Sequence, residues 1–207
     1  MGRRIIRAVV QIVFLALFTL LIITGKTNFW LVLFGISIIL AIFFGRIYCG
    51  WICPINTVMR PINWIYTKLK LNRLNTPKWL KIKIIPWALL ALLVATMMVG
   101  RSFNIKIPGL LLILALGFIF SLVFKPEVFH NYICPFGVLQ SLTGRFAKLT
   151  FRVNKDKCSG CGICLKVCDA EAININNKKA AIDPKLCHQC SNCKIECPAD
   201  AIDYKSK

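Results

Sequence analysis

Cysteine residues carry the clearest chemical signal in this chain of 207 residues, which contains eleven of them. Eight of them form two runs with the same spacing, Cys-x2-Cys-x2-Cys-x3-Cys. The first run is Cys158, Cys161, Cys164 and Cys168, and the second is Cys187, Cys190, Cys193 and Cys197. The second run repeats the first at an offset of 29 residues, and the flanking sequence Ala-Glu-Ala-Ile (170–173) returns as Ala-Asp-Ala-Ile (199–202). Thiolates in such a pattern indicate a soft-metal centre.

The spacing favours iron-sulfur clusters over the other uses of cysteine. Two zinc sites would need ligands in a two-by-two spacing, and a disulfide framework would suit a small secreted domain. Three thiolates on one tight loop can hold three corners of a cubane, and the fourth must then come from elsewhere. This is the spacing of bacterial two-cluster ferredoxins, in which the last Cys of each run serves the other cluster. We therefore predict one 4Fe–4S cluster on Cys158, Cys161, Cys164 and Cys197, and a second on Cys187, Cys190, Cys193 and Cys168.

Two details qualify this pattern. Asp169 follows Cys168 where the pattern has Pro, and the change could loosen that corner of the site without removing a ligand. His188 lies inside the second run. We interpret it as a polar neighbour that tunes the potential through hydrogen bonds, not as a ligand.

The composition indicates a membrane protein, because hydrophobic residues make up 57% of the chain. Residues 1–150 carry 17 Lys and Arg but only one acidic residue, Glu127, whereas residues 151–207 carry ten basic and seven acidic residues. A net charge of +19 could suggest nucleic acid as a partner. The basic residues, however, cluster between apolar segments, where anionic headgroups attract them. We predict a lipid bilayer and no nucleic acid as partner.

Four apolar runs precede the cysteine repeat, at residues 5–23, 29–44, 82–99 and 108–124. A full span needs about 20 residues, so the second and fourth runs are slightly short. Most Lys and Arg lie at the N-terminus and in the second loop, which predicts that both termini and the ferredoxin domain face the cytosol, with the protein in the cell (inner) membrane. Within the second loop, residues 56–74 read as an amphipathic interfacial helix. The predicted domains are thus a four-helix transmembrane domain over 1–150, built from two hairpin repeats, and a small α+β two-cluster ferredoxin domain over 151–207.

A second possible site lies in the membrane half, where two segments match at an offset of 81 residues. In this match Cys49 corresponds to His130, and Cys53-Pro corresponds to Cys134-Pro. A residue and its fourth neighbour share one face of a helix. If the repeats face each other, Cys49, Cys53, His130 and Cys134 would bring three thiols and an imidazole together at a membrane-proximal cluster or metal site.

At this point the chain resembles the membrane-bound polyferredoxins of the NapH, NosR and CcoG type. That resemblance rests on the Cys-Gly-Trp-Ile-Cys-Pro segment at 49–54 and on the ferredoxin repeat, and it covers most of residues 29–200. It implies two Cys-x3-Cys-Pro motifs on cytosolic helix ends and a domain with two 4Fe–4S clusters. Members of the family are implicated in quinol oxidation, in accessory electron supply and in metal-ion reduction. His130 departs from the family pattern, which has Cys there.

Three interpretations of His130 stay open. It could be a fourth ligand, as His replaces Cys in Rieske centres, a proton acceptor beside a quinol, or a polar residue at a helix end. The favoured function is a membrane-bound electron-transfer protein that relays electrons between quinol or a partner complex and the ferredoxin clusters, as a subunit of an oxidoreductase. One alternative is a metallo-assembly factor or reductase of copper or another metal ion, and another is a plain membrane anchor for the ferredoxin. Arg46, Arg60 and Trp51 could line a quinol site, but we expect interfacial anchoring from each.

Overall fold

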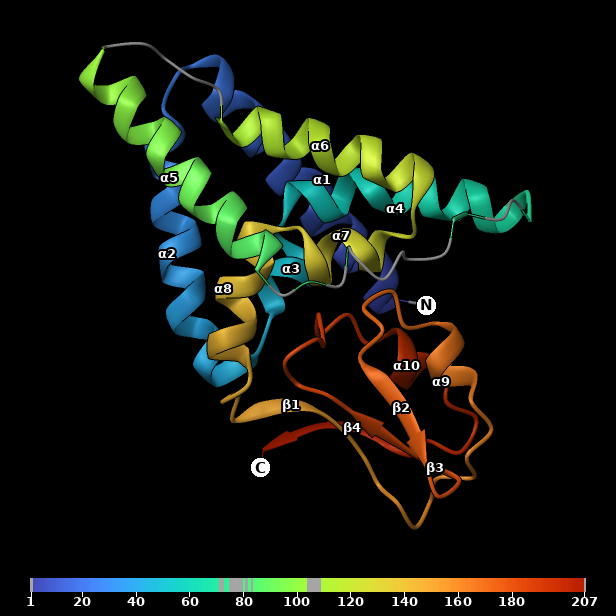
Figure 1. Cartoon of the computed structure of the whole chain (residues 1–207). Coiled ribbons are helices and arrows are strands. Elements are labelled where there is room, and N and C mark those ends of the chain that lie inside the picture. Colours follow the sequence, from blue (N-terminus) through green and yellow to red (C-terminus); the bar gives the residue numbers. More distant parts are fainter. Residues whose placement is uncertain are drawn as a thin grey trace. The chain divides into compact units, whose positions relative to one another are not determined.

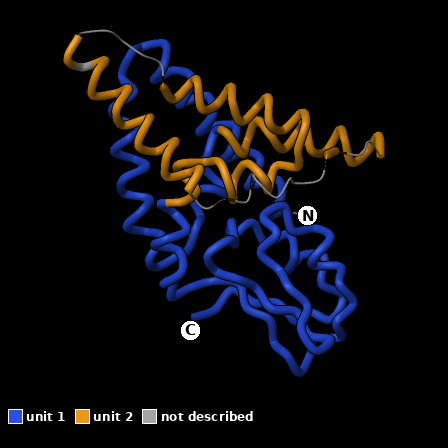
Figure 2. Tube along the Cα trace, viewed as in Figure 1, with its two compact units in different colours: residues 1–54, 139–207 blue, residues 55–138 orange. Residues whose placement is uncertain are grey.

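A computed structural model describes residues 2–70, 73–74, 80, 82, 84–103 and 109–206 (Figure 1). Helices α1 to α8 come first in the chain, and strands β1 to β4 with the short helices α9 and α10 follow. The chain divides into two compact units, residues 1–54 with 139–207 and residues 55–138 (Figure 2). The protein is therefore mostly helical, with a small α+β region at its C-terminal end, as predicted.

The first unit begins with a helical hairpin of α1 (Gly2–Ile23) and α2 (Thr27–Phe44). A Schellman motif ends α1: the N–H of Lys26 donates to the carbonyl of Leu21 at 2.9 Å, and the N–H of Gly25 donates to that of Ile22 at 3.0 Å. Gly25 has a φ of 69°, which glycine adopts without a steric penalty. The turn therefore reverses the chain within three residues.

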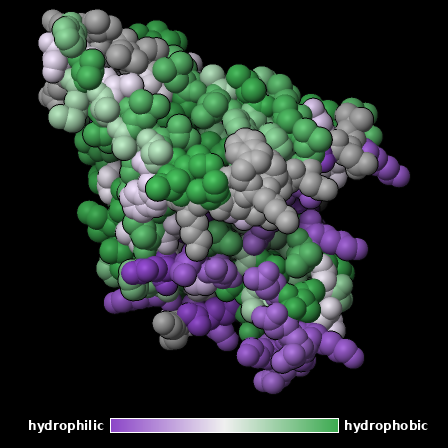
Figure 3. Space-filling model, viewed as in Figure 1, coloured by the Kyte–Doolittle hydropathy of each residue, from purple (hydrophilic) through white to green (hydrophobic). Residues whose placement is uncertain are grey.

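Two helices of the described chain, α1 and α2, are long and apolar enough to cross a membrane. At 1.5 Å per residue they are about 33 and 27 Å long. Only Arg7, Gln11 and Phe18 of α1 are buried, so most of its apolar side chains are exposed. Figure 3 shows hydrophobic side chains over the helices and hydrophilic ones over the C-terminal region. Two further apolar helices, over Ile85–Gly100 and Gly109–Val123, are shorter. The predicted total of four spans stays a prediction, and the start of the fourth run at Pro108 lies outside the described residues.

The second unit contains most of α4 (Pro54–Lys68) together with α5 (Ile85–Ser102), α6 (Gly109–Val123) and α7 (Pro126–Tyr132), and α8 (Pro135–Gly144) leads back to the first unit. Gly117 allows α6 to approach α4 and α7, because a Cβ at this position would lie 3.2 Å from Cε of Met59 and 3.3 Å from the Phe129 ring. The hydroxyl of Tyr66 donates to the carbonyl of Leu122 at 2.8 Å and links α4 to the end of α6.

Helix α4 occupies most of the range predicted for an interfacial helix, residues 56–74. It ends earlier, at Lys68, and Lys70 has a left-handed φ of 53°. Residues 71–72 of that range lie outside the described residues. The exposed fractions of Trp64 and Leu69 are both 62%, which leaves apolar surface for a lipid headgroup region. Its place at a membrane surface stays a prediction.

The C-terminal region is built from two antiparallel strand pairs. Strand β1 (Leu149–Val153) pairs with β4 (Ile202–Ser206), and β2 (Ile173–Asn176) pairs with β3 (Lys179–Ile182). Asn177 and Lys178 both have a positive φ, as the two-residue turn of a tight hairpin requires. Helices α9 (Ile163–Lys166) and α10 (Asn192–Ile195) each contain the third cysteine of a run and end before the fourth. The core is made of small and medium apolar side chains and cysteines: Phe151, Ala170, Ala172, Ile173, Ala180, Ala201, Ile202, Cys158, Cys164, Cys187 and Cys193.

The 29-residue repeat of the sequence is also present in the backbone. Left-handed φ angles occur in pairs at this offset, with 72° at Gly160 and 55° at Gln189, and with 77° at Gly162 and 61° at Ser191. The first pair lies inside the two cysteine loops, and the second pair caps α9 and α10. Such turns direct successive N–H groups to one side and form concavities of the kind that hold anions and iron-sulfur centres.

Candidate iron-sulfur sites

The first cavity lies beside residues 158–164, which we call the first loop. Four cysteines line it, Cys158, Cys161, Cys164 and Cys197, together with Val153, Ala180 and Ile202. It encloses about 350 Å³ of empty space, part of it open to solvent. Cys197 follows α10 and thus comes from the other half of the repeat. The four thiols that the spacing predicts for one cluster therefore surround one cavity.

The second cavity repeats this arrangement beside residues 187–193, the second loop. Its lining includes Cys187, Cys190, Cys193 and the crossed Cys168, with apolar walls from Phe151 and Ile173. The empty space is about 310 Å³, close to that of the first cavity. All eight cysteines are free thiols. Among the described residues, no three His, Cys, Asp or Glu side chains are close enough to hold a single metal ion.

Backbone N–H groups point at the crossed cysteines in the same way in both halves. The N–H of Ala172 donates to Sγ of Cys168, and the N–H of Ala201 donates to Sγ of Cys197, both at 3.4 Å. In the first loop, Sγ of Cys158 accepts from Ala180 N–H at 3.5 Å. These donors favour the charged thiolate form that a metal requires.

The pKa values of the thiols follow from this environment. Hydrogen bonds from the backbone N–H groups of Ala180 and Gly160 lower the pKa of Cys158. Burial raises the pKa of Cys187 far above its usual range and that of Cys193 to about 12. A buried thiolate without a compensating cation is unfavourable, whereas coordination to a metal deprotonates the thiol outright. The donor set and the dry walls therefore fit a thiolate-bound cluster.

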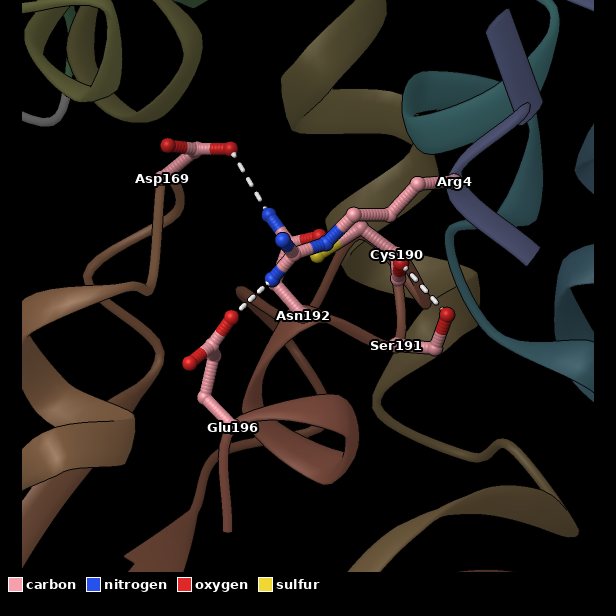
Figure 4. Close-up of polar contacts among 6 residues, drawn as sticks. All are labelled: Arg4, Asp169, Cys190, Ser191, Asn192 and Glu196. Atoms are coloured by element: carbon pink, nitrogen blue, oxygen red, sulfur yellow. Dashed lines mark hydrogen bonds and ion pairs between the residues drawn. The ribbon is translucent and has the colours of Figure 1, made fainter. Parts of the chain in front are cut away.

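The two unusual residues of the sequence have defined places beside these cavities. Asp169, which stands where the ferredoxin pattern has Pro, accepts a hydrogen bond from the side-chain amide of Asn192 at 3.3 Å (Figure 4). This contact joins the chain after Cys168 to the start of α10, so the corner that could have been loosened by the loss of Pro is held by a polar contact. His188 lines the second cavity and is buried, with an exposed fraction of 3%.

The two motifs of the membrane half have the same local backbone. Helix α3 (Ile47–Trp51) carries Cys49, and α7 carries the corresponding His130. After α3 the N–H of Cys53 donates to the carbonyl of Tyr48 at 2.9 Å, and after α7 the N–H of Cys134 donates to that of Phe129 at 2.8 Å. Each Cys therefore stands just beyond a wide final turn, and the Pro after it opens the next helix.

The two candidate ligands of each motif are four residues apart, which suggested a continuous helix. In the structure, Cys53 and Cys134 lie past the helix ends. All four candidate ligands are buried, with exposed fractions of 3 to 4%. Cys49 and Cys53 belong to one compact unit, and His130 and Cys134 belong to the other. Their convergence on one site stays a prediction.

Sequence reasoning missed a close contact between the second loop and residues 45–51, which we call the α3 segment. The indole N–H of Trp51 donates to the carbonyl of Gln189 at 3.0 Å. A Cβ on Gly50 would lie 2.0 Å from the carbonyl oxygen of His188, so only glycine permits this approach of two backbones. The glycine between the two cysteines of the motif was the one available signal.

Buried polar side chains fix the same contact from α1 and from the start of α3. The carbonyl of Gly50 accepts from Nε of Arg7 and from Nε2 of Gln11, both at 2.9 Å. Arg46 donates from Nη1 to the carbonyl of Lys185 at 3.1 Å, and its exposed fraction is only 1%. Trp51 and Arg46 thus bind the ferredoxin region, which is a different role from the interfacial anchoring expected for them.

Comparison with known proteins places this arrangement in a class. A family model described as a 4Fe-4S binding domain matches residues 28–72 and 107–154, the two segments that carry the membrane-half motifs. A second model, described as a 4Fe-4S dicluster domain, matches residues 157–202. The chain is therefore a 4Fe–4S ferredoxin-type protein, which confirms the predicted iron-sulfur class.

Three relatives show which 4Fe–4S ferredoxin-type proteins this chain is similar to. An uncharacterised protein of Methanocaldococcus jannaschii is 31% identical over 180 residues, which cover 83% of this chain and 69% of the relative. The ferredoxin-type protein NapH of Escherichia coli is 26% identical over 190 residues, 83% of this chain and 66% of NapH. The methylamine utilization ferredoxin-type protein MauN of Methylobacillus flagellatus is 28% identical over 140 residues, 61% of this chain and 49% of MauN.

This chain belongs to the ferredoxin-type family that includes NapH, NosR and MauN, which confirms the resemblance drawn from its motifs. It spans about half the length of MauN and about two thirds of NapH. No solved structure gives a significant match.

Proposed function

We propose that this protein is a membrane-bound electron-transfer protein that relays electrons between membrane quinol, or a partner complex, and two 4Fe–4S clusters on the cytosolic side. It would act as a subunit of an oxidoreductase in the cell membrane. The observation that carries the proposal is the pair of cavities, each surrounded by four thiols taken from both halves of the repeat. Bound 4Fe–4S clusters supply one-electron transfer.

The residues around the cavities have separate roles in this proposal. Cys158, Cys161, Cys164 and Cys197 would hold one cluster, and Cys187, Cys190, Cys193 and Cys168 would hold the other. The N–H groups of Ala172 and Ala201 orient the crossed thiols. Apolar walls from Phe151 and Ile202 exclude water from the cavities. The low local dielectric constant strengthens electrostatic interactions and hydrogen bonds inside them.

The membrane half would span the bilayer four times, with both termini in the cytosol. The exposed apolar surfaces of α1 and α2 support the first two spans. Cys49, Cys53, His130 and Cys134 would form a third site, and the burial of all four supports a ligand role. Oxidation of one quinol releases two electrons and two protons, so a protein with more than one single-electron centre suits quinol as a donor.

The first test is the content of iron, acid-labile sulfide and copper in the anaerobically purified protein and in His130→Ala. Three 4Fe–4S clusters predict about twelve irons per chain, with about eight in the variant if His130 is a ligand. About eight irons in the wild type, together with stoichiometric copper that Cys49→Ser loses, would instead support a metal reductase or assembly factor.

A second test separates a relay from a plain anchor. A short-chain quinol analogue is added to the oxidised protein, and the visible absorbance of the clusters is followed. We expect bleaching in the wild type and none in Cys53→Ser, with the ferredoxin irons retained in both. Equal bleaching in both proteins would exclude the third site from the relay, and bleaching in neither would exclude quinol as the donor.

A further inference from the structure

The two cysteine loops differ in what covers them, although they are repeats of one another. The second loop lies under the α3 segment through Gly50 and Trp51. The N-terminal end of α1 reaches the same side, where Arg4 forms an ion pair with Glu196 at the end of α10 (Figure 4). Cys187, His188 and Gln189 are all buried.

The first loop has no such cover from the helices of its own unit in the contacts of the described residues. Cys161 is exposed, whereas its counterpart in the second loop, Cys190, is half-buried, and the two other cysteines of each loop are buried. Its close neighbour is the β2–β3 hairpin of the same region: a Cβ on Gly160 would lie 2.1 Å from the carbonyl oxygen of Lys178. Nζ of Lys179 donates to the carbonyl of Cys158 at 2.6 Å. The edge at Cys161 is thus open to solvent.

Three lysines lie beside the first loop, either next to it in the chain or on the hairpin that contacts it. Lys157 precedes the loop and is exposed, as is Lys178 on the hairpin that contacts Gly160, and Lys179 is held on the loop by its hydrogen bond. We call these three lysines the basic rim. Asp156 precedes Lys157, the exposed Asp200 follows Pro198 of the cavity wall, and Asp203 faces Lys157 while it is paired with Lys194. The exposed Lys155 and Lys166 flank the loop in the chain, so lysines still outnumber these carboxylates.

We propose that the Cys161 edge and the basic rim form the docking surface for a soluble, acidic, one-electron carrier protein. This docking surface rests on the proposed function and adds to it the order in which electrons would pass through the two clusters. The cluster of the second loop would face the α3 segment, and the cluster of the first loop would exchange single electrons with the soluble partner. Each encounter passes one electron between the partner and the first-loop cluster, so one centre is oxidised as the other is reduced. Opposite charges on the two surfaces would steer the encounter and set its orientation.

The test measures binding itself. The full-length protein in detergent micelles is titrated with an acidic bacterial-type two-cluster ferredoxin, and the Kd is determined at several salt concentrations. The probe variant is Lys157→Glu with Lys178→Glu. The matched control is Lys26→Glu with Lys185→Glu, which changes the net charge equally. Both residues are exposed; Lys26 lies in the turn between α1 and α2, and Lys185 precedes the covered second loop.

We expect the probe variant to raise the Kd more than tenfold at low salt and to lose most of the salt dependence, while the control changes the Kd less than threefold. A basic cytochrome c should bind the wild type more weakly than the acidic ferredoxin does. Equal weakening by both double variants, or by neither, would overturn the proposal. Bleaching by quinol is measured on the same samples, so a failed docking surface with intact quinol reduction is distinguishable from a failed relay.

Discussion

The contact between Gly50 and the second loop makes a quantitative prediction for Gly50→Ala. The new methyl group would lie 2.0 Å from the carbonyl oxygen of His188 and 3.1 Å from its carbon. Contacts under 3.0 Å do not persist, so one backbone has to move by about 1 Å. The neighbour is main chain and cannot rotate away as a flexible side chain could.

The magnitude follows from two opposing effects. Overpacking costs about 1–3 kcal/mol, and we expect the upper end because the obstacle is a backbone. Alanine in place of glycine within a helix recovers about 0.5–1 kcal/mol. The net loss is therefore about 2 kcal/mol in the free energy that holds the second loop on the α3 segment, which corresponds to about a 30-fold change in the opening equilibrium.

Amide hydrogen exchange of a peptide that covers residues 185–191 measures this opening directly. We expect exchange in that peptide to rise about 30-fold in Gly50→Ala. Gly35→Ala in α2 is the matched control, because a Cβ there meets nothing within 4 Å and the substitution should leave this peptide unchanged. Unchanged protection in Gly50→Ala would refute the close approach of the two backbones.

Four further predictions follow from the same geometry. Cys197→Ser should remove the cluster of the first loop and Cys168→Ser that of the second, which Mössbauer or EPR spectra of the remaining cluster would distinguish. Arg46→Gln should lower the reduction potential of the second-loop cluster in an EPR-monitored titration, because it removes a buried positive charge whose Nε and Nη2 have no hydrogen-bond partner among the described residues. Iron chelation should loosen the ferredoxin region in circular dichroism. Burial raises the pKa of Cys193 from 9.0 to about 12. The protonated thiol therefore contributes its full stability to the iron-free fold below pH 9, and this stability is lost as the pH rises towards 12. The iron-loaded protein should not show this loss. In the second unit, Gly117→Ala should cost about 1–3 kcal/mol in thermal unfolding, since the new Cβ would lie 2.8 Å from Cγ2 of Ile55, a β-branched side chain that cannot easily turn away.

Much of the C-terminal site could be predicted from sequence because its geometry is local. Three cysteines within seven residues line one loop, and the fourth cysteine, four residues further on and past a short helix, points away from that loop. The structure places Cys197 in the lining of the first cavity and Cys168 in that of the second, and their binding of clusters there stays a prediction. Glycine at positions 160 and 162 also signals the left-handed backbone conformation found there. The corresponding residues Gln189 and Ser191 adopt the same conformation without any such signal in the sequence.

In the membrane half, the hydrophobic pattern located the long helices but not the helix ends at the cysteine motifs. Apolar runs located α1, α2, α5 and α6 to within a few residues. The fourfold spacing of Cys49 and Cys53 suggested one helix face, yet the helix ends at Trp51 because Pro54 opens a new one. The residue before a proline disfavours helical geometry, and this local rule outweighs the spacing.

The sequence by itself predicted the two crossed cysteine sets and located the apolar helices, because each depends on residues close together along the chain. Only the tertiary structure decided that the second loop is covered and the first is open. The hydrogen bonds from Trp51 and Arg46 to the second loop and the residues before it join positions 138 and 139 apart. Their acceptors are the main-chain carbonyls of Gln189 and Lys185, a group that every residue possesses. A hydrogen bond to such a group leaves no residue type to recognise, so two loops with the same cysteine spacing acquire different surroundings only when the chain folds.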